Sequence, residues 1–159
     1  MPNHRKPHTL PAHVTNFVVA HVGDARQVSA KTGVPVEVIL AQSAIESSWG
    51  RTVKDNAYFG VKGRTPSGQS TSFATHEYTA HGKVLTQGTF RAYTGYADAA
   101  QDYASVISRR YAGALVYKHD PVRFAQEVAR QGYATDPDYG KKLESIIKHD
   151  IIPALGAKP

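Results

Sequence analysis

The stretch ILAQSAIESSWGR, residues 39–51, is the part of the chain around which the other segments are arranged. Pro35 can begin a helix that leads into it, because the missing N–H of proline falls among donors that a helix start leaves unpaired. Apolar and small residues then recur at the spacing of an amphipathic helix: Val36, Ile39, Leu40, and Ser43 or Ala44. Gly50 is the expected end of this helix.

Glu46 lies two helical turns after Ile39 and therefore returns to the buried stripe of the predicted helix. Burial penalises the charged form of a carboxyl group, so the pKa of Glu46 should rise unless a cation pairs with it. A carboxyl group that stays protonated near neutral pH can protonate a leaving oxygen. The helix alone favours the commoner alternative, a glutamate that faces solvent or caps a neighbouring helix. The later segments change that balance.

The composition is that of one globular domain. A chain of 159 residues can bury about two-thirds of its unfolded surface, and 41% hydrophobic with 20% charged residues is ordinary. The absence of cysteine excludes disulfides and thiol chemistry. A net charge of +6 indicates an anionic partner such as the bacterial wall, an acidic membrane surface or nucleic acid. The positive charges are scattered, and no basic run marks a nucleic-acid-binding arm.

The first half of the chain predicts a helix, the helix of Glu46, and then strands. Residues 1–10 are typical of a flexible tail and lack the apolar core of a signal peptide. Apolar spacing from residue 11 to 31 predicts a helix that Gly33 ends. Residues 54–93 predict two or three short antiparallel strands, among them 69–78 and 83–93, which are rich in Thr, Tyr, Phe and Val. A turn at residues 80–82 would join the last two strands into a hairpin.

Helices resume near Ala97 and continue to the C-terminus. Asp120-Pro121 and Asp136-Pro137 each place an N-cap acceptor before a proline at the first helical position. No window is long and apolar enough for a membrane span. The pattern predicts an α+β domain at residues 11–159, in which a β-lobe at about 57–93 faces a helical body across a cleft.

Five motifs follow one another along the chain: AQSAIESSWG (41–50), NAYFGVKG (56–63), THEY (75–78), FRAY (90–93) and GYATDP (132–137). In this order they resemble the bacterial peptidoglycan N-acetylglucosaminidases of the flagellar and autolysin type, glycoside hydrolase family 73. The resemblance covers nearly the whole chain. It implies a lysozyme-like α+β fold with a mainly helical body, and endo-β-N-acetylglucosaminidase activity without a cofactor.

The resemblance also implies roles for three residues. Glu46 corresponds to the general acid, Glu77 to a second carboxylate on the hairpin, and Tyr133 to a tyrosine that lines the site. Glycoside hydrolysis commonly uses two carboxyl groups, although the acetamido group of the substrate can replace the second. Glu77 as a solvent-facing strand residue and Tyr133 as a core aromatic are the alternatives.

Three further residues are candidates for substrate binding. Trp49 and Tyr58 could stack on sugar rings or pack in the corner behind Glu46. Asn56 could hold the loop after the helix through side-chain to backbone hydrogen bonds. No metal site is expected, because His76 and His81 are five residues apart, whereas the zinc-protease motif needs a spacing of four on a helix.

Two other functions remain open at this stage. A lytic transglycosylase also uses one helix-borne glutamate, but the NAYFGVKG stretch resembles the glucosaminidases. A non-catalytic wall-binding module would have no need of Glu46, Glu77 and Tyr133 together. No recognition motif supports a nucleic-acid binder.

The expected partner is the glycan strand of peptidoglycan, cut after N-acetylglucosamine by a monomer acting in the periplasm or cell wall, without membrane insertion. With no signal peptide expected, delivery would rely on a specialised secretion system or on lysis. The resemblance includes type VI secretion effectors, which favours an antibacterial toxin over a phage lysin. Such a toxin implies an immunity protein that plugs the cleft.

Overall fold

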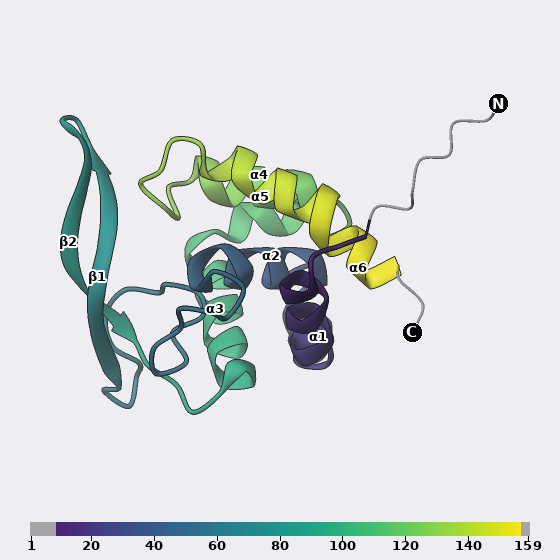
Figure 1. Cartoon of the computed structure of the whole chain (residues 1–159), viewed down its shortest axis with the longest axis horizontal. Helices are drawn as coiled ribbons and strands as arrows, with labels where there is room; N and C mark the ends of the chain where they lie inside the picture. Colours follow the sequence, from purple (N-terminus) through teal and green to yellow (C-terminus); the bar gives the residue numbers. More distant parts are fainter. Residues whose placement is uncertain (1–8, 157–159) are drawn as a thin grey trace.

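The computed structural model describes residues 9–156, so the predicted tail lies, apart from residues 9 and 10, outside the described part of the chain. A body of helices faces a two-stranded hairpin that stands to one side (Figure 1). The elements in chain order are α1 (Ala12–Thr32), α2 (Val36–Ser47), β1 (Ser70–Thr79), β2 (Gly82–Arg91), α3 (Tyr96–Arg110), the 3₁₀ helix η1 (Ala112–Tyr117), α4 (Pro121–Arg130), α5 (Tyr139–Ile146), the π-helical segment η2 (Ile147–Ile151) and α6 (Ile152–Gly156).

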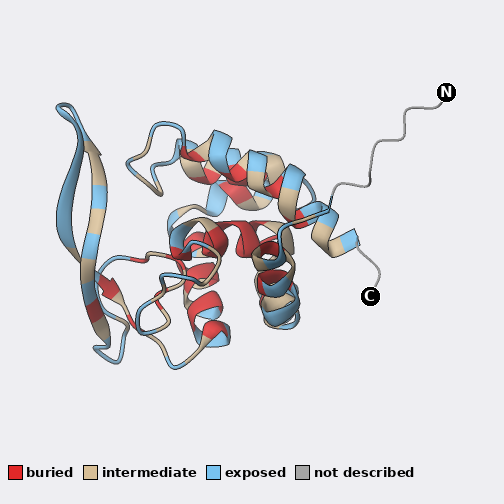
Figure 2. Cartoon of the chain, in the orientation of Figure 1, coloured by how far each residue is buried: buried red, intermediate tan, exposed pale blue. Residues whose placement is uncertain are grey.

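Helix α2 is the centre of the helical body, and it is not amphipathic as its spacing predicted. Every residue at 38–44 is buried, with α1 on one side and α4 and α5 on the other (Figures 1 and 2). Small residues let the neighbours approach closely, and the Ser43 hydroxyl meets the Tyr96 hydroxyl of α3 at 2.8 Å. A helix surrounded on all sides is apolar all round. Glu46 therefore lies near the end of a buried helix rather than on one stripe of a surface helix.

Helix α2 ends earlier than its sequence predicted. The helix stops at Ser47, before the predicted end at Gly50. Ser48, Trp49 and Gly50 all have positive φ, at 48°, 59° and 78°. This left-handed run ends the helix two residues after Glu46.

Two local end signals act as predicted. Gly33 ends α1 with φ 82°, and its N–H bonds to the carbonyl of Ser29. The Asp120 carboxylate accepts the N–H of Arg123 at 3.2 Å, so Asp120 caps α4 with Pro121 in its first position.

Two proline signals act differently from their prediction. Pro35 is the N-cap of α2 rather than its first helical residue. Helix α5 begins at Tyr139 rather than Pro137, because the Asp136 carboxylate accepts the N–H of Asp138 and forms a turn ahead of the helix.

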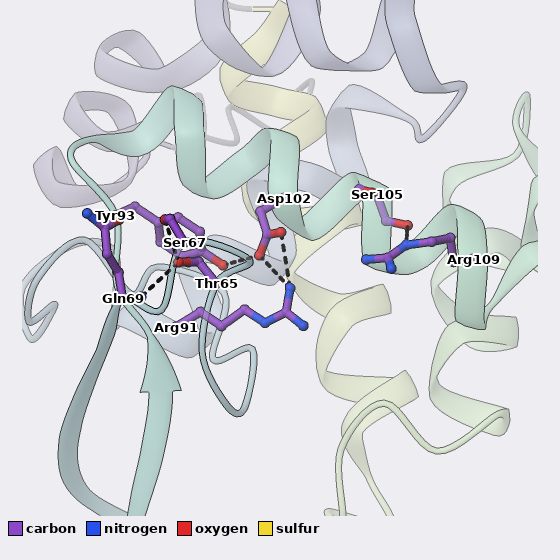
Figure 3. A network of polar contacts seen from close by, with 8 residues as sticks. All are labelled: Thr65, Ser67, Gln69, Arg91, Tyr93, Asp102, Ser105 and Arg109. Atoms are coloured by element: carbon purple, nitrogen blue, oxygen red, sulfur yellow. Dashed lines mark hydrogen bonds and ion pairs between the residues drawn. The ribbon is translucent and has the colours of Figure 1, made fainter.

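The hairpin has the predicted antiparallel pairing, from Ser70 opposite Arg91 to Thr79 opposite Gly82. Its base is fastened to α3, because the Arg91 guanidinium and the Tyr93 hydroxyl both donate to the Asp102 carboxylate (Figure 3). The segment around Lys62 adds to the sheet, since Lys62 bridges to Phe90. These contacts hold the hairpin at its base and leave its length beside the helical body.

In the described part of the chain, no helix is both long enough and apolar enough to cross a membrane.

Candidate active site

A cleft of about 450 Å³ separates the hairpin from the helical body. It is lined by the end of α2, the loop at 60–62, strand β1, the end of α3, and the segment from 132 to 142. Glu46, Glu77 and Tyr133, which sequence reasoning placed in one site, all line this cleft.

Glu46 presents its carboxyl group to the cleft from the last turn of α2. The predicted buried position is wrong, because Glu46 is exposed on the side of the cleft. The protein atoms packed around its carboxyl group nevertheless disfavour the charged form. Desolvation raises the pKa of Glu46 to about 7, and the negative charge of Glu77 acts in the same direction. A hydrogen bond from the Tyr139 hydroxyl to Oε1, at 2.9 Å, and the charge of Lys62 oppose the rise in pKa. The net result is a carboxyl group that is substantially protonated near neutral pH.

Gly60 allows the loop backbone to pass directly against this carboxyl group. Gly60 has φ +62°, and a Cβ there would lie 2.7 Å from Oε2 of Glu46. Any side chain would displace the carboxyl group, so the glycine of the NAYFGVKG motif is required by the close approach.

A buried chain of hydrogen bonds leads from the core to Glu46. Tyr103 donates to Oε1 of Gln42. The amide nitrogen of Gln42 donates to the Tyr139 hydroxyl at 3.3 Å, and this hydroxyl then donates to Glu46. Each member has one orientation, because Gln42 uses its acceptor and its donor at opposite ends. The chain fixes Oε1 of Glu46 as an acceptor, which favours Oε2 as the oxygen that carries the acidic proton.

Glu77 reaches the cleft from β1 and is held from two sides. The Lys62 ammonium lies 2.7 Å from Oε1, and the Thr135 hydroxyl donates to Oε2 at 2.9 Å. The hydrogen bond from Lys62, followed by that from Thr135, lowers the pKa of Glu77. The pKa values of the two carboxyl groups in the cleft are therefore shifted in opposite directions, up for Glu46 and down for Glu77. Such a pair can supply a proton donor and an ionised partner in one site.

Tyr133 forms part of the wall beside Glu46. Its hydroxyl donates to the carbonyl of Phe59 at 2.7 Å, and its ring stacks on that of Tyr139 with 6.0 Å between centroids. Burial raises the pKa of the Tyr133 hydroxyl well above its ordinary value, so the group stays neutral. Tyr133 braces the segment that carries Gly60, and it presents an aromatic surface to the cleft.

Trp49, Asn56 and Tyr58 are not among the residues that line the cleft. Trp49 packs edge-on against Phe17, and Tyr58 packs edge-on against Tyr96. The Asn56 amide donates to the carbonyl of Tyr93 at 3.0 Å, which holds the loop after α2 as its alternative role predicted. The contact of these three residues with substrate stays a prediction.

Sequence reasoning missed four residues of the site: Gln42, Lys62, Thr135 and Tyr139. Lys62 and Thr135 lie inside quoted motifs, and Gln42 is a polar residue within the apolar run of α2, so each left a signal. Nothing in the sequence indicated Tyr139, because the direction of its hydroxyl depends on how α5 packs against α2.

A neutral and an ionised carboxyl group that face one cleft of a lysozyme-like α+β fold are the arrangement with which glycoside hydrolases cut sugar chains. Residues 22–150 match the glucosaminidase family, described as mannosyl-glycoprotein endo-beta-N-acetylglucosaminidase. The chain belongs to this family of glycoside hydrolases.

The chain is also similar to named proteins and to solved structures. The peptidoglycan hydrolase FlgJ of Pseudomonas aeruginosa is 30% identical over 93% of this chain, which spans 40% of that relative. The crystal structure of a peptidoglycan hydrolase mutant from Sphingomonas sp. A1 superposes with a TM-score of 0.79 at 30% identity, covering 89% of this chain and 97% of the other. A type VI secretion system effector–immunity complex from Pseudomonas protegens has a TM-score of 0.67 at 21% identity, covering 92% of this chain and 96% of the other, and it shares the fold alone.

Proposed function

We propose that this chain is a catalytic domain, at residues 11–159, that hydrolyses the β-1,4 glycosidic bond after N-acetylglucosamine in bacterial peptidoglycan. The observation that carries the proposal is the pair of carboxyl groups that face one cleft. The pKa of Glu46 is raised to about 7 and the pKa of Glu77 is lowered, which supports a proton donor beside an ionised group. The family to which the chain belongs supports N-acetylglucosamine as the sugar at the cleaved bond. The relatives named as peptidoglycan hydrolases support peptidoglycan as the polymer. The net charge of +6 favours adsorption to an anionic wall.

In the proposed mechanism, Glu46 transfers its proton to the glycosidic oxygen as the bond to the sugar carbon breaks. The ionised Glu77 either activates the attacking water or stabilises the positive charge that develops on the sugar ring. Attack by the substrate's own acetamido group is the alternative to a direct role of Glu77. Tyr133 positions the sugar through its ring and remains un-ionised throughout.

The competing reaction is that of a lytic transglycosylase, in which a hydroxyl of the sugar replaces water. Mass spectrometry of fragments released from purified peptidoglycan distinguishes the two. We expect reducing N-acetylglucosamine ends. Anhydro-muramyl ends would replace the proposal with the transglycosylase, and the absence of any fragments from folded protein would leave a wall-binding module.

Two substitutions should move the pKa of Glu46 in opposite directions. Tyr139→Phe removes the hydrogen bond that lowers this pKa, so we expect a value above the wild-type value of about 7. Glu77→Gln removes the negative charge that raises it, so we expect a value below the wild-type one. The measurement is a titration of the ¹³C carboxyl resonance of Glu46, with Tyr117→Phe, outside the cleft lining, as a control. Shifts in the same direction for both variants would contradict this account of the site.

The raised pKa of Glu46 also links stability to pH. The folded state holds this proton up to about pH 7, whereas an ordinary glutamate has a pKa of 4.5. The stability contributed by neutral Glu46 is therefore complete below about 4.5 and is lost as the pH rises through about 7.

We further propose that the enzyme acts as a monomer in the periplasm or wall of a target bacterium, as an antibacterial effector or lysin. An inhibitor that protects the producer would occupy the cleft over Glu46. The net charge supports wall binding. Expression with export to the periplasm should lyse a test bacterium, and expression in the cytoplasm should not. Growth unaffected by exported, folded protein would reject this setting.

A further inference from the structure

Three side chains with a full positive charge line the cleft among the described residues: Lys62, Arg110 and Lys142. Lys62 is paired with Glu77 at 2.7 Å, and Lys142 is paired with Asp136. The side chain of Arg110 forms no ion pair or hydrogen bond with any residue between 9 and 156. Among these three cations, the Arg110 guanidinium is the one without a protein partner in the described part of the chain.

Arg110 is exposed and is the last residue of α3. A cation in the last turn of a helix is favoured by the helix dipole, and this ordinary explanation applies equally to Arg109. The side chains of Arg109 and Arg110 have different surroundings. The Arg109 guanidinium donates to the carbonyl of Ser105 along its own helix (Figure 3), and Arg109 is not among the cleft-lining residues. The dipole therefore explains a cation at this helix end, but not one that lines the cleft without a partner.

The chemistry of the proposed substrate contains a partner for this charge. The sugar rings carry hydroxyl and acetamido groups, which are neutral. The negative charges of the strand are carboxylates on the branch of muramic acid, either on the lactyl group itself or on the peptide attached to it. A guanidinium matches the planar geometry of a carboxylate and can donate two parallel hydrogen bonds to it.

We propose that Arg110 binds a carboxylate on the lactyl–peptide branch of muramic acid and so selects muramyl-containing glycan over neutral glycan. This inference rests on the proposed function, because it assigns the charged part of the same substrate. Glu46 and Glu77 act on the glycosidic bond, and Arg110 holds the branch beside it.

The test compares wild type, Arg110→Ala and Arg110→Lys, with Arg109→Ala as the matched control. Rates are measured on solubilised peptidoglycan fragments, on the same fragments with their carboxylates converted to amides, and on fragments stripped of peptide that retain the lactyl carboxylate. We expect kcat/KM of Arg110→Ala to fall about tenfold on the untreated fragments, as for loss of a charged hydrogen bond. The kcat/KM of Arg110→Lys should lie between those of wild type and Arg110→Ala, and the kcat/KM of Arg109→Ala should equal that of wild type.

On amidated fragments, the difference between Arg110→Ala and wild type should disappear. Removal of the peptide frees the lactyl carboxylate, which is an amide where peptide is attached. On stripped fragments, a persistent difference shows that Arg110 also binds the freed lactyl carboxylate, and a lost difference shows that it binds only the peptide carboxylate. An Arg110→Ala variant equal to wild type on untreated fragments, or equally impaired on amidated ones, would overturn the inference.

Binding of the untreated fragments to the Glu46→Gln variant, with and without Arg110→Ala, separates this inference from the proposed function. An Arg110-dependent affinity that weakens with added salt supports the carboxylate site even if wild type releases no fragments. Released fragments with an affinity indifferent to Arg110 support the hydrolase and reject the carboxylate site.

Discussion

Glu46→Gln should lower the rate of peptidoglycan hydrolysis by about 10²–10⁴-fold while the protein stays folded, because it removes the general acid. Glutamine has nearly the shape of glutamate, and its carbonyl oxygen can still accept the hydrogen bond from Tyr139. The amide does not give up a proton to the leaving oxygen. The measurement is fragment release by wild type and variant, followed by mass spectrometry.

The control is Glu37→Gln, in the first turn of the same helix and outside the cleft lining. It makes the same chemical change, and we expect wild-type activity. A folded Glu46→Gln variant that keeps more than a tenth of the wild-type rate would mean that another group protonates the leaving oxygen. The thermal stability of the variant above pH 7 should equal or exceed that of wild type, since the variant no longer holds a crowded carboxylate there.

Gln42→Leu should lower the free energy of unfolding by about 2–4 kcal/mol, because the buried hydroxyls of Tyr103 and Tyr139 each lose a partner. Leucine is close to glutamine in size, so little of the effect comes from a cavity. Gln42 is fully buried, and water cannot replace its bonds without a rearrangement of α2.

Urea unfolding at constant pH measures this loss. Gln101→Leu, on the exposed side of α3, makes the same substitution without buried partners and should change stability by less than about 0.5 kcal/mol. A Gln42→Leu protein as stable as wild type would show that the hydrogen-bond chain contributes no net stability. Reduced activity in a folded Gln42→Leu variant would follow from the freed Tyr139, which orients Glu46.

The parts of the fold that could be predicted have their causes close by in the chain. Gly33 ends α1 because glycine takes the left-handed conformation without strain, and Asp120 caps α4 through a carboxylate three residues from its partner. The hairpin register follows from a two-residue turn, which places Thr79 opposite Gly82. The Asp136-Pro137 signal looked identical to Asp120-Pro121, yet it forms a turn, because the Asp136 carboxylate accepts the N–H of Asp138, two residues on. The same carboxylate also pairs with Lys142 of α5.

The character of α2 could not be predicted from spacing, because the burial of its remaining faces depends on helices that follow much later in the chain. The same holds for the site. Residue types and motif order were enough to indicate Glu46, Glu77 and Tyr133, and the structure brings all three to one cleft. Trp49 and Tyr58 carried an equally aromatic signal, and they pack against α1 and α3 outside the residues that line the cleft, so their contact with substrate stays a prediction.

Local signals along the chain therefore suffice for most helix ends and for the hairpin, since capping and turn formation act over a few positions. The candidate carboxyl groups were indicated by the order of the five motifs and the family that they resemble, because the helix of Glu46 taken alone favours a non-catalytic role. The ionisation of those carboxyl groups is a tertiary property. Crowding from Gly60 and the hydroxyl of Tyr139 act on Glu46, and Lys62 and Thr135 act on Glu77. Desolvation and hydrogen bonding depend on atoms that meet only when segments as far apart as residues 46 and 139 pack together. That packing shifts the pKa values of Glu46 and Glu77 in opposite directions.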